Sequence, residues 1–327
     1  MKLFIEKVLQ SNKTLALPIM THPGIETLGY TVLEAVSNGQ IHFEAIKFLS
    51  EKFNTVAATS ITDLTVEAEA FGATVNLPEH EIPTVTGRLV SSAEEVEALK
   101  IPLITDGRIP QYLLANQLAA QNITEIPVFS GCIGPFSLAG RLYDMSEIMV
   151  GIYIEPDVIL QLLQKCTDFL IDYCKALKAT GTAGVIMAEP AAGLLSNEDC
   201  QLYSTNFVKQ IVDAVQDDNF TLILHNCGNH GQCTEAMIAS GAKALHFGNT
   251  IDMQGVLEKC PSDIIVLGNL DPVGVFKQGT PESIRSAVSD LLAKTKDYPN
   301  FVISSGCDLP PFVPEENIKA FLDAVRN

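Results

Sequence analysis

The sequence lacks any long apolar run and is poor in basic residues. No stretch reaches the roughly 18 consecutive apolar residues that suggest a membrane-spanning helix, and the N-terminus shows no signal-peptide pattern. The chain has 21 Lys and Arg against 39 Asp and Glu, which gives a net charge of −18 at pH 7. Such an acidic surface repels nucleic acids and anionic membranes. We therefore predict no nucleic-acid partner, no membrane partner and a cytoplasmic location.

The cysteines lack the spacing of a disulfide or structural-zinc framework. Eight cysteines without an export signal indicate reduced thiols. Tight Cys-x-x-Cys and His-x₃-His pairs, from which structural zinc sites are usually built, are missing. The chain also lacks low-complexity segments, interdomain linkers and convincing internal repeats. We expect one domain over residues 1–327, with a large core because 47% of the residues are hydrophobic.

Short apolar runs that end in small or polar residues alternate with amphipathic segments. The predicted strands are Leu15–Met20, Thr55–Thr59, Pro127–Ser130, Gly184–Ala188, Thr221–His225, Ala244–Phe247, Ile264–Leu267 and Phe301–Ser304. The predicted helices include Met1–Val8, Asp157–Thr180, Asp199–Gln216, Pro281–Lys296 and Pro314–Val325. This alternation predicts an α/β protein with a single (β/α)₈ TIM barrel. Residues Ala68–Ala120 form an N-terminal elaboration with surface excursions at Asn76–Gly87 and Ile101–Ile109.

Three residues at predicted strand ends suggest a metal site. His225 and Cys227 are two positions apart, so their side chains project from the same face of a strand. Cys307 follows another strand and a glycine. One nitrogen and two sulfurs suit Zn²⁺ and leave a coordination position open. Because barrel enzymes act at the carboxyl ends of their strands, where His246 also falls, we predict a catalytic zinc. The alternative is buried core cysteines beside a hydrogen-bonded histidine.

Several motifs carry a family resemblance across nearly the whole chain. They are Asp63-Leu-Thr-Val-Glu-Ala-Glu-Ala-Phe-Gly, Asp106-Gly-Arg-Ile-Pro, Gly134-Pro-Phe-Ser-Leu, Gly268-Asn-Leu-Asp-Pro and Gly306-Cys-Asp-Leu-Pro-Pro. The chain resembles the uroporphyrinogen decarboxylase superfamily and, within it, the cobalamin-dependent methyltransferase branch that includes methylcobamide:coenzyme M methyltransferases. Both branches share one (β/α)₈ barrel, which agrees with the strand count.

The resemblance separates the two branches by their chemistry. Decarboxylases carry an arginine-rich N-terminal loop, and the matching stretch here, Thr21-His-Pro-Gly-Ile25, has no arginine. A family tyrosine is replaced by Arg141 and a family histidine by Cys307, although Asp63 matches a family aspartate. A substrate with many carboxylates needs cationic partners that this stretch lacks.

The methyltransferase branch implies a different use of the same barrel. By resemblance, Zn²⁺ on His225, Cys227 and Cys307 holds a substrate thiol as a thiolate and aims it at the methyl group of a methylated corrinoid. An Asp-x-His-x-x-Gly corrinoid motif is missing, so we expect methylcobalamin to arrive on a separate corrinoid protein. The small substrate is either a thiol like coenzyme M or a methylated compound, and the direction of transfer stays open.

The remaining candidates lie around these ligands. Glu189 is a possible fourth zinc ligand or a carboxylate that orients His225, with an ordinary salt bridge as the alternative. The residues expected to face the substrate or corrinoid are His22, Asp63, Arg108, Arg141, Asn269 and Asp271. A structural role is the alternative for His22 and Asp63, and the motif that holds Asn269 and Asp271 occurs in both branches, which favours shaping of the barrel mouth. Arg108 and Arg141 are the cations available for an acidic acceptor. His230 and Cys233 follow a glycine turn and are expected to face away from the metal ligands.

Two other functions compete with this interpretation. The first is uroporphyrinogen decarboxylation, which needs no metal and binds a polyanion. The second is a non-catalytic corrinoid-binding protein whose zinc only braces the barrel, in which case four protein ligands would close the metal's coordination.

Overall fold

Eight parallel strands form the centre of the computed structural model, which describes residues 4–326. Their order is β1-β10-β9-β8-β7-β6-β5-β2. The strands are β1 (Leu15–Ala16), β2 (Ala58–Thr59), β5 (Val128–Ile133), β6 (Gly184–Ala188), β7 (Thr221–Asn226), β8 (Ala244–Phe247), β9 (Ile265–Leu270) and β10 (Phe301–Ser305). A backbone hydrogen bond from Val56 N–H, two residues before β2, to the Ala16 carbonyl of β1 (3.0 Å) joins the two edges of the sheet. Each predicted strand overlaps an observed one, and the predicted (β/α)₈ barrel is confirmed.

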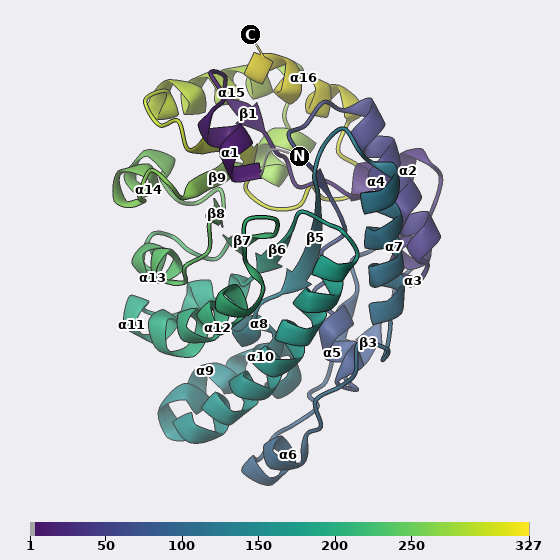
Figure 1. Cartoon of the computed structure of the whole chain (residues 1–327), viewed down its shortest axis with the longest axis vertical. Helices are drawn as coiled ribbons and strands as arrows, with labels where there is room; N and C mark the ends of the chain where they lie inside the picture. The colour runs from purple at the N-terminus through teal and green to yellow at the C-terminus, as the bar shows by residue number, and fades with distance from the viewer. Residues whose placement is uncertain (1–3, 327) are drawn as a thin grey trace.

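Helices surround the strands and connect them (Figure 1). They are α1 (Phe4–Leu9), α2 (His22–Thr27), α3 (Val32–Ser37), α4 (Gly39–Lys52), α5 (Val66–Ala70), α6 (Ala93–Ala98), α7 (Ile109–Asn122), α8 (Pro135–Tyr143), α9 (Met145–Ile154), α10 (Pro156–Ala179), α11 (Asn197–Cys200), α12 (Asn206–Val215), α13 (Thr234–Ala239), α14 (Met253–Lys259), α15 (Pro281–Thr295) and α16 (Glu315–Arg326). Short 3₁₀ or π turns occupy η1 (Pro190–Leu194), η2 (Gln201–Thr205) and η3 (Pro272–Lys277). Among the described residues, no helix has the length and apolarity needed to cross a membrane. The predicted helix at Met1–Val8 is observed from Phe4 onward, and residues 1–3 lie outside the described part.

The predicted helix Asp199–Gln216 is interrupted. A π turn at Gln201–Thr205 separates α11 from α12. Within this turn the Ser204 hydroxyl donates to Glu189 Oε1 (3.0 Å), and the Tyr203 hydroxyl donates to the Ile152 carbonyl. The amphipathic period does not reveal these tertiary contacts, which are made by side chains of the irregular turn.

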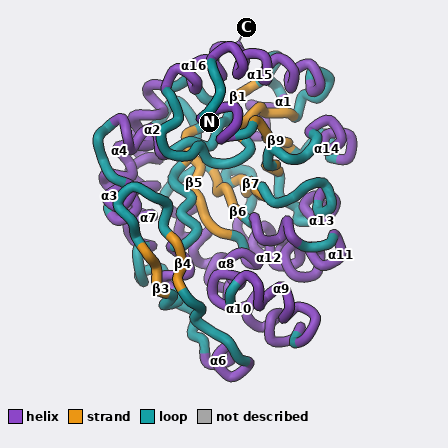
Figure 2. The backbone as a smooth tube through the Cα atoms, turned by 180° about the vertical axis from the view of Figure 1, so that it is seen from behind, coloured by secondary structure: helices purple, strands orange, loops and turns teal. Residues whose placement is uncertain are grey.

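The predicted excursion Asn76–Gly87 contains regular structure. Strands β3 (Thr74–Asn76) and β4 (Thr84–Thr86) pair antiparallel as a separate hairpin. Figure 2 shows this hairpin outside the barrel, between the barrel and α6. Its short Thr-Val-Asn and Thr-Val-Thr strands gain little burial, so their apolar content gives a weak strand signal.

The barrel interior is filled with side chains that alternate along each strand. Ile223, Ala244, Ile265 and Val302 belong to one buried apolar cluster, together with Phe4 and Val8 of α1. The Phe4 ring meets the Phe129 ring edge-on at 5.0 Å between centroids, so α1 packs on the barrel interior. Two residues after Ile223, Ala244 and Val302 come His225, His246 and Ser304. The strand period therefore places a polar layer directly above an apolar one.

Candidate active site

His225, Cys227 and Cys307 meet at the carboxyl end of the strands. Their donor atoms all lie within 4.8 Å of one another. Strand β7 supplies His225, Cys227 follows it directly, and Cys307 follows β10 after Gly306. Gly306 leaves no room for a side chain, because an added Cβ would lie 2.6 Å from the Asn249 backbone nitrogen. The loop after β10 therefore packs tightly against the loop after β8, which is the neighbour of β7 in the sheet.

The three residues open onto a cavity of about 70 Å³. Its other walls include Ile19, Leu64, Ile186, Ala188, Pro190 and Asp308. Of the eight cysteines, only Cys227 and Cys307 are partly exposed, while the other six are buried. The two thiols that the sequence singled out are therefore those a small molecule can reach.

The two thiols lie close enough to shift each other's pKa. The neighbouring Cys307 thiol lowers the pKa of Cys227 below that of an ordinary cysteine. The Cys227 thiol and burial raise the pKa of Cys307. Cys227 is therefore the thiol of the pair that loses its proton more readily.

One ring nitrogen of His225 has no hydrogen-bond partner among the described residues. Its Nδ1 lies 2.7 Å from Nδ1 of His246, whereas its buried Nε2 has no hydrogen-bond partner among the described residues. A buried polar atom without a partner is rare in folded proteins. A tetrahedral zinc ion with bonds of about 2.0–2.3 Å has ligand atoms roughly 3.3–3.8 Å apart, which the 4.8 Å limit accommodates. The orphaned nitrogen and the two sulfurs therefore fit Zn²⁺.

His246 makes the contact that was predicted for Glu189. The Glu189 carboxylate instead accepts hydrogen bonds from Phe136 N–H (2.7 Å), Ser137 N–H (2.8 Å) and the Ser204 hydroxyl (3.0 Å). Burial still raises its pKa. Glu189 thus caps the start of α8 and does not orient His225, which corrects that prediction. Its assignment as a fourth ligand stays a prediction without support from these contacts.

Asp63 and Arg108 bind each other. Arg108 Nη1 lies 2.6 Å from Asp63 Oδ2, and Nε lies 2.7 Å from Glu69 Oε2. The other donors to Asp63 are Tyr112 through its hydroxyl and Thr65 through its hydroxyl and N–H. The prediction that Arg108 is available to an acidic acceptor, and Asp63 to a substrate, is corrected because each side chain already satisfies the other.

Asn269 and Asp271 bind the backbone of the barrel mouth. Asn269 Nδ2 donates to the carbonyls of Gly248 (2.9 Å) and Ile251 (2.8 Å). Asp271 accepts from the N–H groups of Val273 and Gly274. These contacts with loop backbone agree with the interpretation that Asn269 and Asp271 shape the barrel mouth, and their place in a group facing the substrate or corrinoid stays a prediction.

His22 and Arg141 retain unused polar groups. Buried His22 has no partner for its Nδ1 among the described residues. Arg141, near the end of α8, has no hydrogen bond or ion pair within residues 4–326, and burial lowers its pKa. Their expected roles toward substrate or corrinoid stay predictions.

Asp308 is a cavity residue that the sequence did not single out. Its Oδ2 accepts from the Thr21 hydroxyl (3.0 Å), and its buried Oδ1 has no partner within the described chain. Burial raises its pKa. Its position directly after Cys307 was the available signal.

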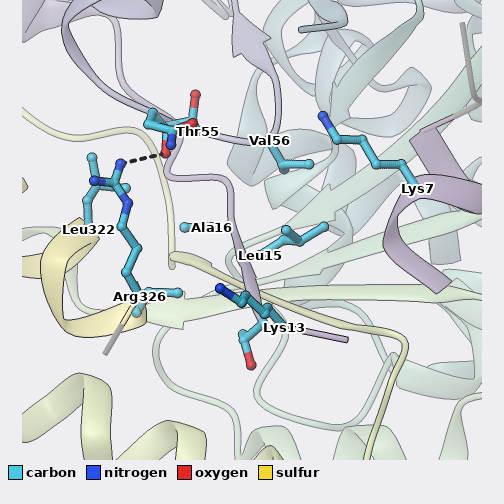
Figure 3. Close-up of a pocket in the computed structure, with 11 residues that line it drawn as sticks. Lys7, Lys13, Leu15, Ala16, Thr55, Val56, Leu322 and Arg326 are labelled. Atoms are coloured by element: carbon cyan, nitrogen blue, oxygen red, sulfur yellow. Dashed lines mark hydrogen bonds between the residues drawn. The ribbon is translucent and has the colours of Figure 1, made fainter. Parts of the chain in front are cut away.

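His230 and Cys233 lie apart from the cavity. His230 is exposed, and the Cys233 thiol contacts the carbonyls of Ala192 (3.4 Å) and Leu195 (3.3 Å). A larger hollow of about 390 Å³ lies at the opposite end of the barrel, where Lys7, Lys13, Leu15 and Arg326 line it (Figure 3). In barrels of this kind, that face serves stability rather than catalysis.

Glu67 gives a pH-dependent prediction near the mouth. Burial raises its pKa to about 7, Oε1 accepts from Ile133 N–H, and Oε2 has no described partner. An unfolded glutamate loses its proton near pH 4.5, so stability falls as pH rises from there to about 7. Between pH 4.5 and 7.5, the free energy of unfolding of Glu67→Gln should rise relative to that of the wild type by on the order of 2–3 kcal/mol. Urea unfolding of both proteins at both pH values measures this change. The same difference in unfolding free energy at the two pH values would contradict the prediction.

Comparison with known proteins gives the family. The model of the uroporphyrinogen decarboxylase (URO-D) family matches residues 18–327. The chain belongs to this family. The resemblance seen in its motifs is thereby confirmed.

The named relatives include both methyltransferases and decarboxylases. Methylcobamide:CoM methyltransferase MtbA of Methanosarcina acetivorans is 28% identical over 269 residues, covering 81% of this chain and 78% of the relative. Uroporphyrinogen decarboxylase of Psychromonas ingrahamii is 26% identical over 285 residues, covering 84% and 79%. A solved methyltransferase from Methanosarcina mazei superposes with a TM-score of 0.90 at 23% identity, covering 99% of this chain and 98% of that one. This last likeness supports the fold.

Proposed function

We propose that the chain is a zinc-dependent methyltransferase that moves a methyl group between a corrinoid and a small thiol or other small methyl donor or acceptor. The observation that carries the proposal is the meeting of a His225 ring nitrogen and the sulfurs of Cys227 and Cys307 within 4.8 Å at the strand ends. The likeness to MtbA, named as a methylcobamide:CoM methyltransferase, adds the substrate class.

The donor set suits thiol activation. His225, Cys227 and Cys307 would hold the metal, and the other described residues bring no further donor into this group. When bound there, zinc supplies Lewis-acid chemistry, because a thiol that ligates it loses its proton at neutral pH. The apolar walls, among them Ile19, Leu64 and Ile186, exclude water and leave the reacting sulfur poorly solvated.

The cavity is too small to enclose a corrinoid. A volume of about 70 Å³ accepts a few heavy atoms and is far too small for a corrin ring. A corrinoid would therefore stay outside and present only its methyl group at the mouth. A separate corrinoid protein is compatible with this arrangement, and the likeness to MtbA, named as a methylcobamide:CoM methyltransferase, supports a corrinoid as the methyl carrier.

Decarboxylation of a polycarboxylate fits less well. None of the described residues lining the cavity is Lys or Arg, and Asp308 adds a carboxyl group. Arg108 is already paired with Asp63 and Glu69. Arg141 alone would leave most carboxylates of a bound tetrapyrrole without the cationic partners that buried anions need.

A direct assay tests the proposal. Zinc-loaded protein should slowly demethylate free methylcobalamin in the presence of a suitable thiol, without oxygen. The methyl group is transferred to the thiolate as a methyl-cation equivalent, and the electron pair of the cobalt–carbon bond stays on cobalt. Cob(I)alamin therefore appears in the absorption spectrum. We expect His225→Ala to slow this by on the order of 100-fold or more, since the loss of a ligand should exceed the 10–100-fold effects typical of residues that orient ligands.

The control is His230→Ala, which removes an exposed imidazole outside the group and should leave the rate within about twofold. The thiol panel starts with coenzyme M, and methylamines or methoxy compounds with cob(I)alamin test the reverse direction. Equal losses in both variants would mean that the site is misplaced. Chelator-resistant turnover of uroporphyrinogen would favour the decarboxylase instead.

A further inference from the structure

Four hydrogen-bonding groups connect the candidate metal site to the far side of the barrel. His225 Nδ1 lies 2.7 Å from His246 Nδ1, and His246 Nε2 lies 2.8 Å from the Ser304 hydroxyl oxygen. Ser304 donates to the Leu17 carbonyl at 2.6 Å. These residues are at most 4% exposed. These hydrogen bonds therefore run through the buried interior from β7 through β8 and β10 to the segment after β1.

The Leu17 carbonyl, the last group in this series, determines which group donates and which accepts in every hydrogen bond. The Leu17 carbonyl can only accept, so the single Ser304 hydroxyl proton is committed to it. The Ser304 oxygen must then accept a proton from His246 Nε2, so a neutral His246 has its lone pair on Nδ1. His225 must donate from Nδ1 to that lone pair, which leaves the lone pair of its Nε2 free.

The opposite order of donors and acceptors would prevent His225 from binding a metal. If His246 donated from Nδ1, His225 would accept on Nδ1 and carry its proton on Nε2. A protonated nitrogen cannot bind a metal ion, and metal-ligating histidines usually have their tautomer set by a partner on the other nitrogen. The Leu17 carbonyl thus selects the tautomer of a ligand that it does not touch.

We propose that His246 and Ser304 are positioning residues that fix the tautomer and ring plane of His225 for metal binding. The two imidazoles meet edge-on, with centroids 4.6 Å apart and an interplanar angle of 71°, so His246 also limits ring rotation. This inference rests on the proposed zinc site. It gives His246 the place that a carboxylate or carbonyl usually holds beside a zinc-binding histidine.

The first test compares zinc affinities by competition with a chromophoric chelator. His246→Phe keeps a ring of similar size but removes both nitrogens, and Ser304→Ala removes the acceptor. Each variant should bind zinc 10–100-fold more weakly, the usual effect of losing such a partner. The matched control is His42→Phe, because His42 is also 1% exposed and accepts a buried hydrogen bond from Ile61 N–H, yet lies outside the ligand group. It should leave zinc affinity within about twofold.

The second test reads the tautomers directly and needs neither metal nor activity. The chain has six histidines, so ¹⁵N-histidine labelling gives a simple spectrum. In the metal-free wild type, His225 should carry its proton on Nδ1 and His246 on Nε2. Variants that each lack one histidine assign the signals. The opposite tautomers would overturn the proposal, whatever zinc affinities His246→Phe and Ser304→Ala show.

The two proposals fail in different ways. If the wild type binds no zinc, the zinc-dependent function fails. If the wild type binds zinc tightly and His246→Phe binds it equally well, only the positioning role fails. Weakened binding in His42→Phe to the same degree would assign the effect to general core disruption and would also overturn it.

Discussion

Cys227→Ala and Cys307→Ala should each reduce bound zinc from about one ion per chain to less than about one tenth. Each substitution removes one of three donors, and the remaining pair cannot compete with buffer or chelator for the ion. Methyl transfer should fall below detection in both variants, a larger effect than the loss of any positioning residue. Elemental analysis of protein purified and dialysed without added metal measures the zinc, and circular dichroism verifies the fold.

The matched control is Cys260→Ala, because Cys260 is a buried thiol that lies outside the ligand group. It should keep its zinc and its activity. Full zinc content in both ligand variants would remove the basis of the proposed function. X-ray absorption completes the experiment: a sulfur ligand gained on adding thiol supports catalysis, whereas an unchanged shell of four protein ligands would favour a bracing metal.

The fold was predictable because each element carries its own signal. Strands such as Thr221–Asn226 and Phe301–Ser305 are buried along their whole length, so they appear in the sequence as apolar runs. Elements that depend on distant contacts were not predictable. The π turn at Gln201–Thr205 is one example, since Ser204 there meets Glu189.

The meeting of His225, Cys227 and Cys307 was predictable for a related reason. His225 and Cys227 share a face through the two-residue strand period, and barrel geometry gathers strand ends with Cys307. His246 was missed as a partner because its role depends on the register that pairs it with His225 across β7 and β8. Sequence spacing does not contain that register.

The polar residues of the mouth show the opposite error. Asp63 and Arg108 looked like groups waiting for a ligand because each was considered alone. Placed 2.6 Å apart, they satisfy each other, and Glu69 takes the other side of the guanidinium. The sequence shows that both residues carry charge, but their mutual pairing required the folded structure.

This pairing leads to the second large effect, which is on stability. Asp63→Ala should lower the free energy of unfolding by about 3–5 kcal/mol, because it leaves the Arg108 charge buried with one fewer partner. The Asp63 and Arg108 side chains are 1% and 9% exposed, so water cannot replace the lost carboxylate. Urea unfolding followed by circular dichroism measures the change through the shift in midpoint.

Glu69→Ala provides the comparison within the same network. Its side chain is 25% exposed, so solvent screens the pair and the expected cost is about 1 kcal/mol. The double variant of Asp63→Ala with Arg108→Ala should cost less than the sum of the two single changes, because the second removes the charge that the first leaves unpaired. A different result would restore the substrate role: Asp63→Ala would leave stability within about 0.5 kcal/mol while raising the KM for the thiol or the corrinoid partner.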